Sequence, residues 1–302
     1  MFQRYLRPLR FPRGNPRGIG LMLLSTICYS LLHALIREMS NELHPFELAF
    51  FRNLFGLLVV LPWFIRYGLA PLRTSRLGLH AVRAGLNVIA VLSYFYALSV
   101  VPLADATALS FTAPIFTTVL AIFFFREFVG IRRWIAILIG FAGAFVVLRP
   151  GIESVTVGQL LVLTYALFFA FALIVTKILG QTESSVTIIT YVSLLMVPIS
   201  VIPAVLVWQT PSLVQIGVML IMGILGTSAQ LLMTQALKEG ETHVVMPFDF
   251  TKMIWAVLLG LLVFQEIPGI YTWLGIAMII SSAFYIGYRE HVVRVSGIED
   301  GK

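Results

Sequence analysis

The sequence predicts an all-α integral membrane protein with ten transmembrane helices, arranged as two inverted five-helix repeats. Of the 302 residues, 59% are hydrophobic and 12% are charged, whereas a soluble domain contains about 45–50% apolar and about 25% charged residues. Ten apolar stretches approach the length of about 20 residues that crosses a bilayer. Because a water-soluble core of this size could not bury all of them, the chain is predicted to lie in a membrane.

The predicted spans occupy most of the chain. In order, they are Gly18–Ile36, Pro45–Ile65, His80–Val100, Leu103–Phe125, Arg132–Leu148, Gly158–Thr176, Val186–Val207, Leu213–Ala236, Thr242–Phe264 and Ile270–Tyr288. Within each stretch the apolar residues are continuous and do not alternate with polar ones, which favours helices over the strands of a membrane β-barrel.

The basic residues predict how these helices are oriented. With the N-terminus in the cytoplasm, Arg37 and Arg149 lie on the outer side. Arg52, Arg83 and Lys252 then lie within spans, and the rest of the 21 lysines and arginines lie on the inner side. Cytoplasmic loops carry such an excess, so both termini are predicted to be cytoplasmic. Contact with anionic membrane lipid then accounts for the net charge of +7, and no nucleic-acid partner is expected.

The two halves of the chain match each other at a constant spacing. Phe111-Thr112 aligns with Phe250-Thr251, Glu127 with Glu266, Gly130-Ile131 with Gly269-Ile270, and Trp134 with Trp273. Five helices in each copy is an odd number, so the second copy must enter the membrane from the opposite side. The predicted organisation is a tail at residues 1–17, repeats at 18–150 and 158–289, and a tail at 290–302. Inverted repeats are common in secondary transporters, whose substrate sits between the halves near the bilayer midplane.

The first half also contains a series of distinctive motifs. They are Tyr94–Ser99 (YFYALS), the loop Val100–Leu103, Ala104–Leu109, Pro114 within FTAPIF, Arg126-Glu127 ahead of Arg132-Arg133-Trp134, and Val147–Gly151. Together they resemble the drug/metabolite transporter superfamily and, within it, the EamA-type permeases, over residues 18–289. The second half departs from this pattern, because Lys252 and Met253 occupy the positions equivalent to Ala113 and Pro114.

The resemblance implies two inverted sets of five helices, a central cavity and the movement of small organic metabolites across the bacterial inner membrane. It admits amino acids, vitamins such as riboflavin, S-adenosylmethionine and nucleotide sugars as substrates, without selecting among them. We therefore expect a secondary transporter that works by alternating access, as a monomer or a weak homodimer. The alternative from another class is a non-transporting membrane sensor or scaffold.

Charged residues inside the spans are the first candidates for a substrate site, because such residues are costly in a bilayer and normally face a cavity or a partner. Arg52 has a guanidinium suited to a substrate carboxylate or phosphate, or it serves as a structural clamp to backbone carbonyls or to Glu47. Asp249 and Lys252 lie three positions apart on one helix face. They could bind a zwitterion or simply neutralise each other. Arg83 lies near the inner surface, where it is expected to snorkel to the headgroups.

The remaining candidates are aromatic, titratable or helix-breaking residues. Trp255, Tyr94, Tyr96 and Phe116 are predicted to line the substrate pocket, with core or lipid packing as the alternative for each. Asp249 and His33 are the candidate sites for proton coupling. Pro114 and Pro247 are the candidate hinges, because proline frees carbonyls one turn earlier.

The sequence contains none of the common enzyme motifs. There is no GxSxG, HExxH or phosphate-binding glycine loop, and the five histidines lack metal-ligand spacing. The protein is therefore not expected to be an enzyme, and no cofactor or metal is expected.

Overall fold

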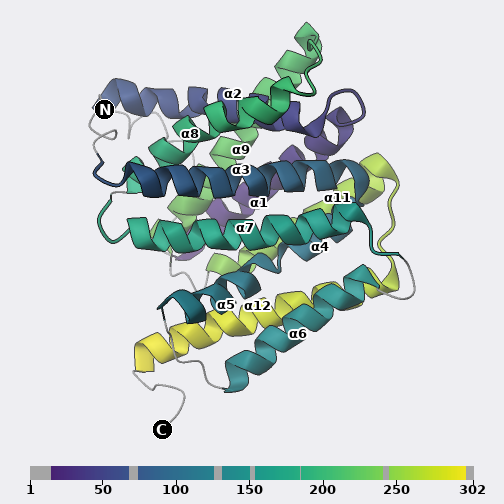
Figure 1. The fold of residues 1–302 in the computed structure, drawn as a ribbon. Helices are drawn as coiled ribbons and strands as arrows, with labels where there is room; N and C mark the ends of the chain where they lie inside the picture. The colour runs from purple at the N-terminus through teal and green to yellow at the C-terminus, as the bar shows by residue number, and fades with distance from the viewer. Residues whose placement is uncertain are drawn as a thin grey trace.

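A computed structural model describes residues 15–67, 74–125, 131–149, 154–183, 185–240 and 245–296. These residues form eleven α-helices and one short 3-10 helix (Figure 1). They are α1 Asn15–Met39, α2 Pro45–Tyr67, α3 Leu77–Val100, α4 Leu103–Ser110, α5 Ala113–Phe125, α6 Ile131–Leu148, α7 Val157–Leu179, α8 Ser185–Val205, α9 Leu213–Glu239, η3 Met246–Thr251, α11 Lys252–Phe264 and α12 Ile270–Ser296. Within this part of the chain, six segments are long and apolar enough to cross a membrane.

The helices correspond to the predicted spans with two kinds of difference. First, α1 begins at Asn15 and α12 continues to Ser296, so helix extends into both predicted tails, whose residues 1–14 and 297–302 lie outside the described residues. Second, the predicted spans Leu103–Phe125 and Thr242–Phe264 are not single helices. The first divides into α4 and α5, and the described part of the second divides into η3 and α11.

The two breaks occur at equivalent positions of the two halves. α4 ends before Phe111-Thr112, and η3 ends with Phe250-Thr251. The Thr112 hydroxyl donates to the carbonyl of Leu109, and the Thr251 hydroxyl donates to the carbonyl of Phe248, each at 2.7 Å. The rings of Phe111 and Phe250 meet with 5.0 Å between their centres. Equivalent breaks therefore face each other in the interior of the bundle.

Most of the extensive helix contacts join one half of the chain to the other. α1 packs on α9 while α3 packs on α7, and α2 packs on both α8 and α9. Figure 1 shows α3 and α7 side by side in front, and α6 with α12 as a pair below them. The protein is therefore one interlocked bundle, in which the core between helices is also the boundary between the halves.

The α6–α12 pair is antiparallel and closely packed. Gly140 faces Ser282, while Gly143, further along α6, faces Ile279, which comes earlier on α12. The Ser282 hydroxyl donates to the carbonyl of Ala136 at 2.5 Å. Small residues on α6, among them Ala136, Gly140 and Gly143, thus allow this close contact.

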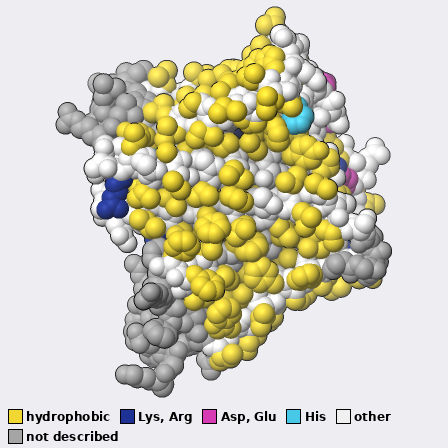
Figure 2. Space-filling view, in the orientation of Figure 1, with side chains coloured by type: hydrophobic (Ala, Val, Ile, Leu, Met, Phe, Trp, Pro, Cys, Tyr) yellow, Lys and Arg dark blue, Asp and Glu magenta, His cyan; other side chains and the backbone are white. Residues whose placement is uncertain are grey.

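The surface toward the viewer in Figure 2 is suited to a bilayer. Hydrophobic side chains cover its middle, and charged side chains gather at its left and right edges. Several large apolar side chains are more than 70% exposed, among them Phe123, Ile131 and Leu262. Such a surface fits lipid rather than water, and the fold is that of a multi-pass membrane protein.

Enlarging Gly143 should destabilise the α6–α12 pair. A Cβ there would lie 2.8 Å from Met278 Cβ and 2.9 Å from the Gly275 carbonyl oxygen, and backbone cannot rotate away. We expect Gly143→Leu to cost about 1–3 kcal/mol, the usual cost of overpacking, and to lower the thermal midpoint of the purified protein in detergent. Gly217→Leu is the matched control, because nothing lies within 4 Å of a Cβ at Gly217. Equal midpoints for the two variants would show that this contact is not tight.

Candidate functional site

The break between η3 and α11 brings two opposite charges together inside the bundle. Asp249 in η3 and Lys252 at the start of α11 form an ion pair, with 2.5 Å between Oδ1 and Nζ. Their side chains are only 17% and 19% exposed. Taking charges out of water costs several kcal/mol per ion, so an ionised pair at this depth marks a candidate functional site.

Helix α1 places polar and aromatic side chains against this ion pair. Lys252 Nζ lies 4.9 Å from the centre of the Tyr29 ring, a cation–π contact. The hydroxyls of Thr26 and Thr251 are 3.0 Å apart. One turn further along α1, the ring of His33 lies 6.1 Å from that of Tyr29. Tyr29 was not among the residues predicted from the sequence. Thr26, Tyr29 and His33 are spaced three and four residues apart, which places their polar side chains on one face of α1 and would indicate Tyr29 as a candidate.

Arg52 reaches the same region from α2. Its side chain lines a small space between α2, α8 and α9, together with Gly56, Thr227 and Gln230. The guanidinium lies on the backbone of α9, because a Cβ at Gly226 would come within 2.7 Å of Arg52 Nε. Arg52 Nη1 donates to Asn53 Oδ1 at 3.0 Å, while Nε is buried with no hydrogen-bond partner among the described residues. We call Tyr29, His33, Arg52, Asp249 and Lys252 the central cluster.

The structural alternative for Arg52 is a clamp to backbone carbonyls or to Glu47, and among the described residues Arg52 forms no ion pair with Glu47. Glu47 Oε2 instead accepts a hydrogen bond at 3.1 Å from the backbone N–H of Gln209. Because arginine is effectively always charged, the central cluster contains two cations and one carboxylate. A ligand with an anionic or acceptor group would balance it.

Two tyrosines adjoin the central cluster. The Tyr94 ring lies 5.0 Å from that of His33 and 4.4 Å from that of Tyr165 on α7. Tyr165 in turn stacks on Phe169, with 5.6 Å between ring centres. Tyr94 was predicted from the sequence, whereas Tyr165 and Phe169 were not. These rings come from both halves of the chain and form an aromatic wall beside the charges.

The other predicted pocket residues lie in different surroundings. Tyr96 packs near His44 and Phe46, and Phe116 packs against Phe141 on α6. Trp255 lies one turn beyond Lys252 on α11, and its Nε1 is buried without a hydrogen-bond partner in the described part of the chain. Tyr96 and Phe116 therefore make no ring contact with the central cluster.

The two predicted hinge prolines lie at the helix breaks. Pro114 is the second residue of α5, and Pro247 is the second residue of η3. Proline is tolerated in a first turn, where its missing N–H is not needed. Both residues thus mark the starts of helical segments rather than kinks within them.

Arg83 does not snorkel as expected. It is 8% exposed, and its Nε donates to Thr176 Oγ1 at 2.6 Å while Nη1 donates to the carbonyl of Ile188 at 2.9 Å. Arg83 therefore joins α3 of the first half to α7 and α8 of the second.

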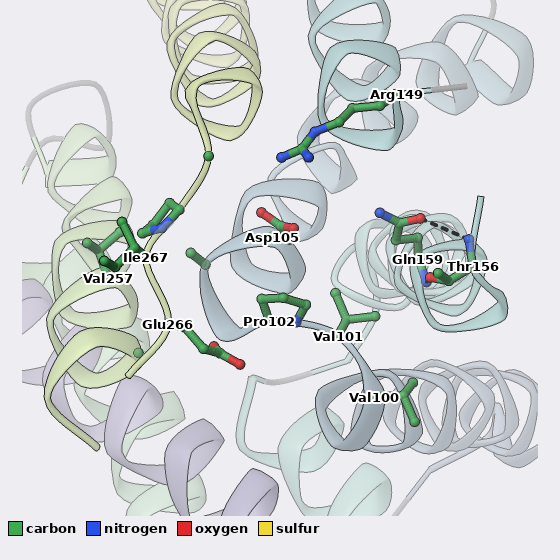
Figure 3. Close-up of a pocket in the computed structure, with 14 residues that line it drawn as sticks. Val100, Val101, Pro102, Asp105, Arg149, Thr156, Gln159, Val257, Glu266 and Ile267 are labelled. Atoms are coloured by element: carbon green, nitrogen blue, oxygen red, sulfur yellow. Dashed lines mark hydrogen bonds between the residues drawn. The ribbon is translucent and has the colours of Figure 1, made fainter. Parts of the chain in front are cut away.

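A second feature, which we call the outer pocket, is a cavity of about 450 Å³ between the halves. Its lining includes Asp105, Arg149, Gln159, Val257 and Glu266. Figure 3 shows Arg149, Asp105 and Gln159 turned toward a common space, with Glu266 beside it on the segment after α11. The volume is that of a metabolite-sized site.

Contacts across the halves surround the outer pocket. Arg37 pairs with Glu266 and donates to the carbonyl of Val101. Glu266 Oε2 accepts from the backbone N–H of Leu103 at 3.1 Å. This position is set by Gln265, whose left-handed backbone (φ 56°) ends α11 and turns the chain sharply. Glu266 therefore connects the second half to α1 and α4, and Arg37 extends this contact to the end of α3.

Of the two aligned glutamates, Glu266 lies within the described part of the chain and Glu127 does not. The contacts of Glu266 are long-range in sequence, and no spacing rule predicts them.

Comparison with known families gives matches to both halves. The EamA-like transporter family matches residues 16–149 and 156–288. A relative named an S-adenosylmethionine uptake transporter, from Rickettsia bellii, is 31% identical over 273 residues, which cover 90% of this chain and 94% of the relative. A relative named a riboflavin transporter, from Vibrio cholerae, is 31% identical over 279 residues, which cover 91% and 94%.

The fold also resembles a solved structure. A protein crystal structure with 17% sequence identity superposes with a TM-score of 0.61, covering 92% of this chain and 98% of the other. At this identity the likeness concerns the fold alone.

The Asp249–Lys252 pair should be energetically coupled. Lys252→Met leaves a carboxylate in the bundle without its cation, which costs more than removing both charges. We expect Lys252→Met to lower the thermal midpoint, and Asp249→Asn combined with Lys252→Met to recover part of the loss. A double-mutant cycle should give a coupling free energy of about 0.5–3 kcal/mol. Purely additive effects would mean that the pair does not interact.

Proposed function

The chain belongs to the EamA-like transporter family, and from this premise we propose that it carries a metabolite of the S-adenosylmethionine or riboflavin type across the bacterial inner membrane. It is a transporter rather than an enzyme. The relatives bearing these two names match at nearly full length. Both named metabolites combine a flat ring with polar groups.

The observation that carries the proposal is the central cluster. Two cations and one carboxylate lie between the halves, beside the aromatic wall of Tyr94 and Tyr165. Secondary transporters bind substrate where repeats meet, at discontinuous helices. Here the break between η3 and α11 holds Asp249 and Lys252. In this proposal Arg52 binds an acceptor group of the substrate, and the aromatic wall, with Trp255 on the same helix as Lys252, contacts its ring.

We further propose an inverted topology with both termini in the cytoplasm. The antiparallel packing of α6 and α12, the last helices of the two copies, supports it. The concentration of basic residues on one side of the spans supports the orientation. The bacterial relatives support the inner membrane.

Alternating access would then rock the halves about the central cluster. Pro114 and Pro247, at the breaks, are proposed as the points where segments pivot. Asp249 and His33 are the proposed proton sites if transport is coupled to a pH gradient. The rival proposal, a non-transporting sensor or scaffold, predicts no solute flux at all.

The direct test is transport by purified protein in liposomes. S-adenosylmethionine and riboflavin are offered within a mixed metabolite panel, with and without a pH gradient, and internal solutes are measured by mass spectrometry against empty liposomes. Saturable, protein-dependent accumulation of one compound supports the carrier. If the pH gradient accelerates transport, the variants Asp249→Asn and His33→Gln are tested next, in order to identify the proton site. Folded, inserted protein that moves no panel member would favour the non-transporting alternative.

Arg52 should be essential for transport. We expect Arg52→Ala to abolish saturable uptake while membrane insertion stays intact, because a substrate acceptor group loses its charged donor. Gly226→Ala should reduce uptake with all charges retained, since a Cβ there would lie 2.7 Å from Arg52 Nε. Gly217→Ala, on the open surface of the same helix, is the control. Uptake by Arg52→Ala at the parent rate would show that the arginine is structural.

A further inference from the structure

Arg52 forms no ion pair within the described part of the chain. Asp249, the carboxylate of the central cluster, is already paired with Lys252. Glu47, on the same helix as Arg52, accepts instead from the backbone of Gln209. Because arginine is always charged, a positive charge inside a span is left without a counter-ion, and an uncompensated charge at such a depth is costly.

The one described acceptor of Arg52 is neutral and is held in place. Asn53 Oδ1 accepts from Arg52 Nη1, while Asn53 Nδ2 donates to Ser200 Oγ at 3.3 Å. Ser200 Oγ in turn donates to the carbonyl of Val197 at 3.1 Å. A guanidinium has five N–H donors, and Arg52 Nε is among those left buried without a partner in the described residues. This chain of bonds orders Arg52 but supplies no negative charge.

The guanidinium borders the small space between α2, α8 and α9, which we call the Arg52 pocket. Its volume of about 30 Å³ is room for one or two water-sized groups. Ser193, Thr227 and Gln230 contribute hydroxyl and amide groups to its lining. No acidic residue lines it among the described residues, so every group able to bind a ligand there is either positive or neutral.

Two glycines keep this pocket small. A Cβ at Gly226 would lie 2.7 Å from Arg52 Nε, and a Cβ at Gly56 would lie 2.6 Å from Thr227 Oγ1. The helices α2 and α9 therefore approach closely on either side of the guanidinium. A space of this size admits a single-atom ion and excludes a polyatomic ion such as sulfate.

We propose that the Arg52 pocket binds one small monovalent anion of the halide type, held by Arg52 and by the hydroxyl and amide donors of Ser193, Thr227 and Gln230. Hydrogen bonds from charged donors to an anion are stronger than those between neutral groups. A water molecule or another uncharged ligand would fill the same volume but leave the charge of Arg52 uncompensated. The central cluster has two cations and one carboxylate, so one monovalent anion brings its charge to zero.

This inference goes beyond the proposed transport function, and anion binding does not depend on it. Where transport occurs as proposed, the anion and an acceptor group of the substrate compete for the same guanidinium. Chloride should then raise the substrate concentration that gives half-maximal uptake. Only this competition rests on the proposed function.

The experiment measures chloride binding to the purified full chain in phosphatidylcholine nanodiscs, by equilibrium dialysis with radioactive chloride. Gluconate replaces chloride so that the ionic strength stays constant. We expect one chloride per chain, displaced by bromide and not by sulfate. Arg52→Met, which removes the charge, should weaken binding about tenfold or more, because the donor of the charge-assisted bond is lost. Arg52→Lys keeps a cation and should weaken binding less.

Two substitutions on α9 separate recognition by the pocket from general damage. Gln230→Leu removes one amide of the lining and should weaken chloride binding. Gln235→Leu is the matched control, because this amide donates to Glu239 at 2.8 Å and does not line the pocket. Thermal midpoints verify folding, and chloride should raise the midpoint of the parent, since a ligand stabilises the state that binds it. If Arg52→Met is unstable, Gln230→Leu and Arg52→Lys provide the comparison.

The outcomes separate this inference from the transport proposal. It is overturned if the parent binds no more chloride than empty nanodiscs, if Arg52→Met binds chloride as tightly as the parent, if Gln230→Leu and Gln235→Leu weaken binding equally, or if sulfate displaces chloride as readily as bromide does. Protein that binds chloride through Arg52 yet moves no solute in liposomes would reject the proposed function and retain the anion site. Saturable transport by protein that binds no chloride would do the reverse.

Discussion

The hydrocarbon core of a bilayer contains no water to satisfy a free carbonyl or amide, and the arrangement of this bundle depends on that constraint. Two of its spans change helical geometry part-way: α4 ends at Ser110 and α5 begins at Ala113, while η3 passes directly into α11. The Thr112 and Thr251 hydroxyls bond to carbonyls of their own preceding turn. The two junctions also lie together, where the ring of Phe111 packs against that of Phe250 and separates them from lipid. Both junctions therefore lie where the halves meet, in the interior of the bundle.

At these two helix junctions the copies are alike in position but differ in residue type. The position of the junction and the threonine hydroxyl bond at it recur in both copies, although α4 is an α-helix and η3 a 3-10 helix. The chemistry does not repeat, because the positions equivalent to Asp249 and Lys252 are Ser110 and Ala113. One copy therefore supplies the ion pair, while α2 of the other copy supplies Arg52. A site formed in this way requires both halves, which matches the interlocked packing of α1 on α9 and α3 on α7.

The sequence predicts the helices and the repeat, but only part of the central cluster. Long apolar runs locate spans because residues within a span face lipid or other helices and are mostly apolar. Charged residues inside such runs, such as Arg52, Asp249 and Lys252, are therefore easy to recognise. The sequence predicts Leu103–Phe125 as one span with a candidate hinge at Pro114, and it does not locate the end of α4 at Ser110, because FTAPIF is nearly as apolar as an unbroken helix. Tyr29 and Tyr165 were missed for a related reason, since an aromatic residue in an apolar span is usually ordinary packing. The Arg37–Glu266 pair joins residues far apart in sequence, and only the packing of the halves brings them together.

Where these charges lie determines what each can do in a carrier with two conformations. In the proposed carrier, the central cluster lies between the halves, where the substrate would bind in both states. It can discriminate between solutes but cannot by itself favour one conformation.

A contact between the halves near one end acts differently, since it exists only while that end is closed. The Arg37–Glu266 pair and the hydrogen bonds of Thr272 with Arg149 and Asp105 are contacts of this kind, whereas Arg83 joins the halves with bonds to a hydroxyl and a carbonyl. A ligand shifts such an equilibrium only by binding one state better than the other. In the proposed carrier, the groups that would bias opening are therefore those near the outer pocket, and the groups that would select the solute are those at the central cluster.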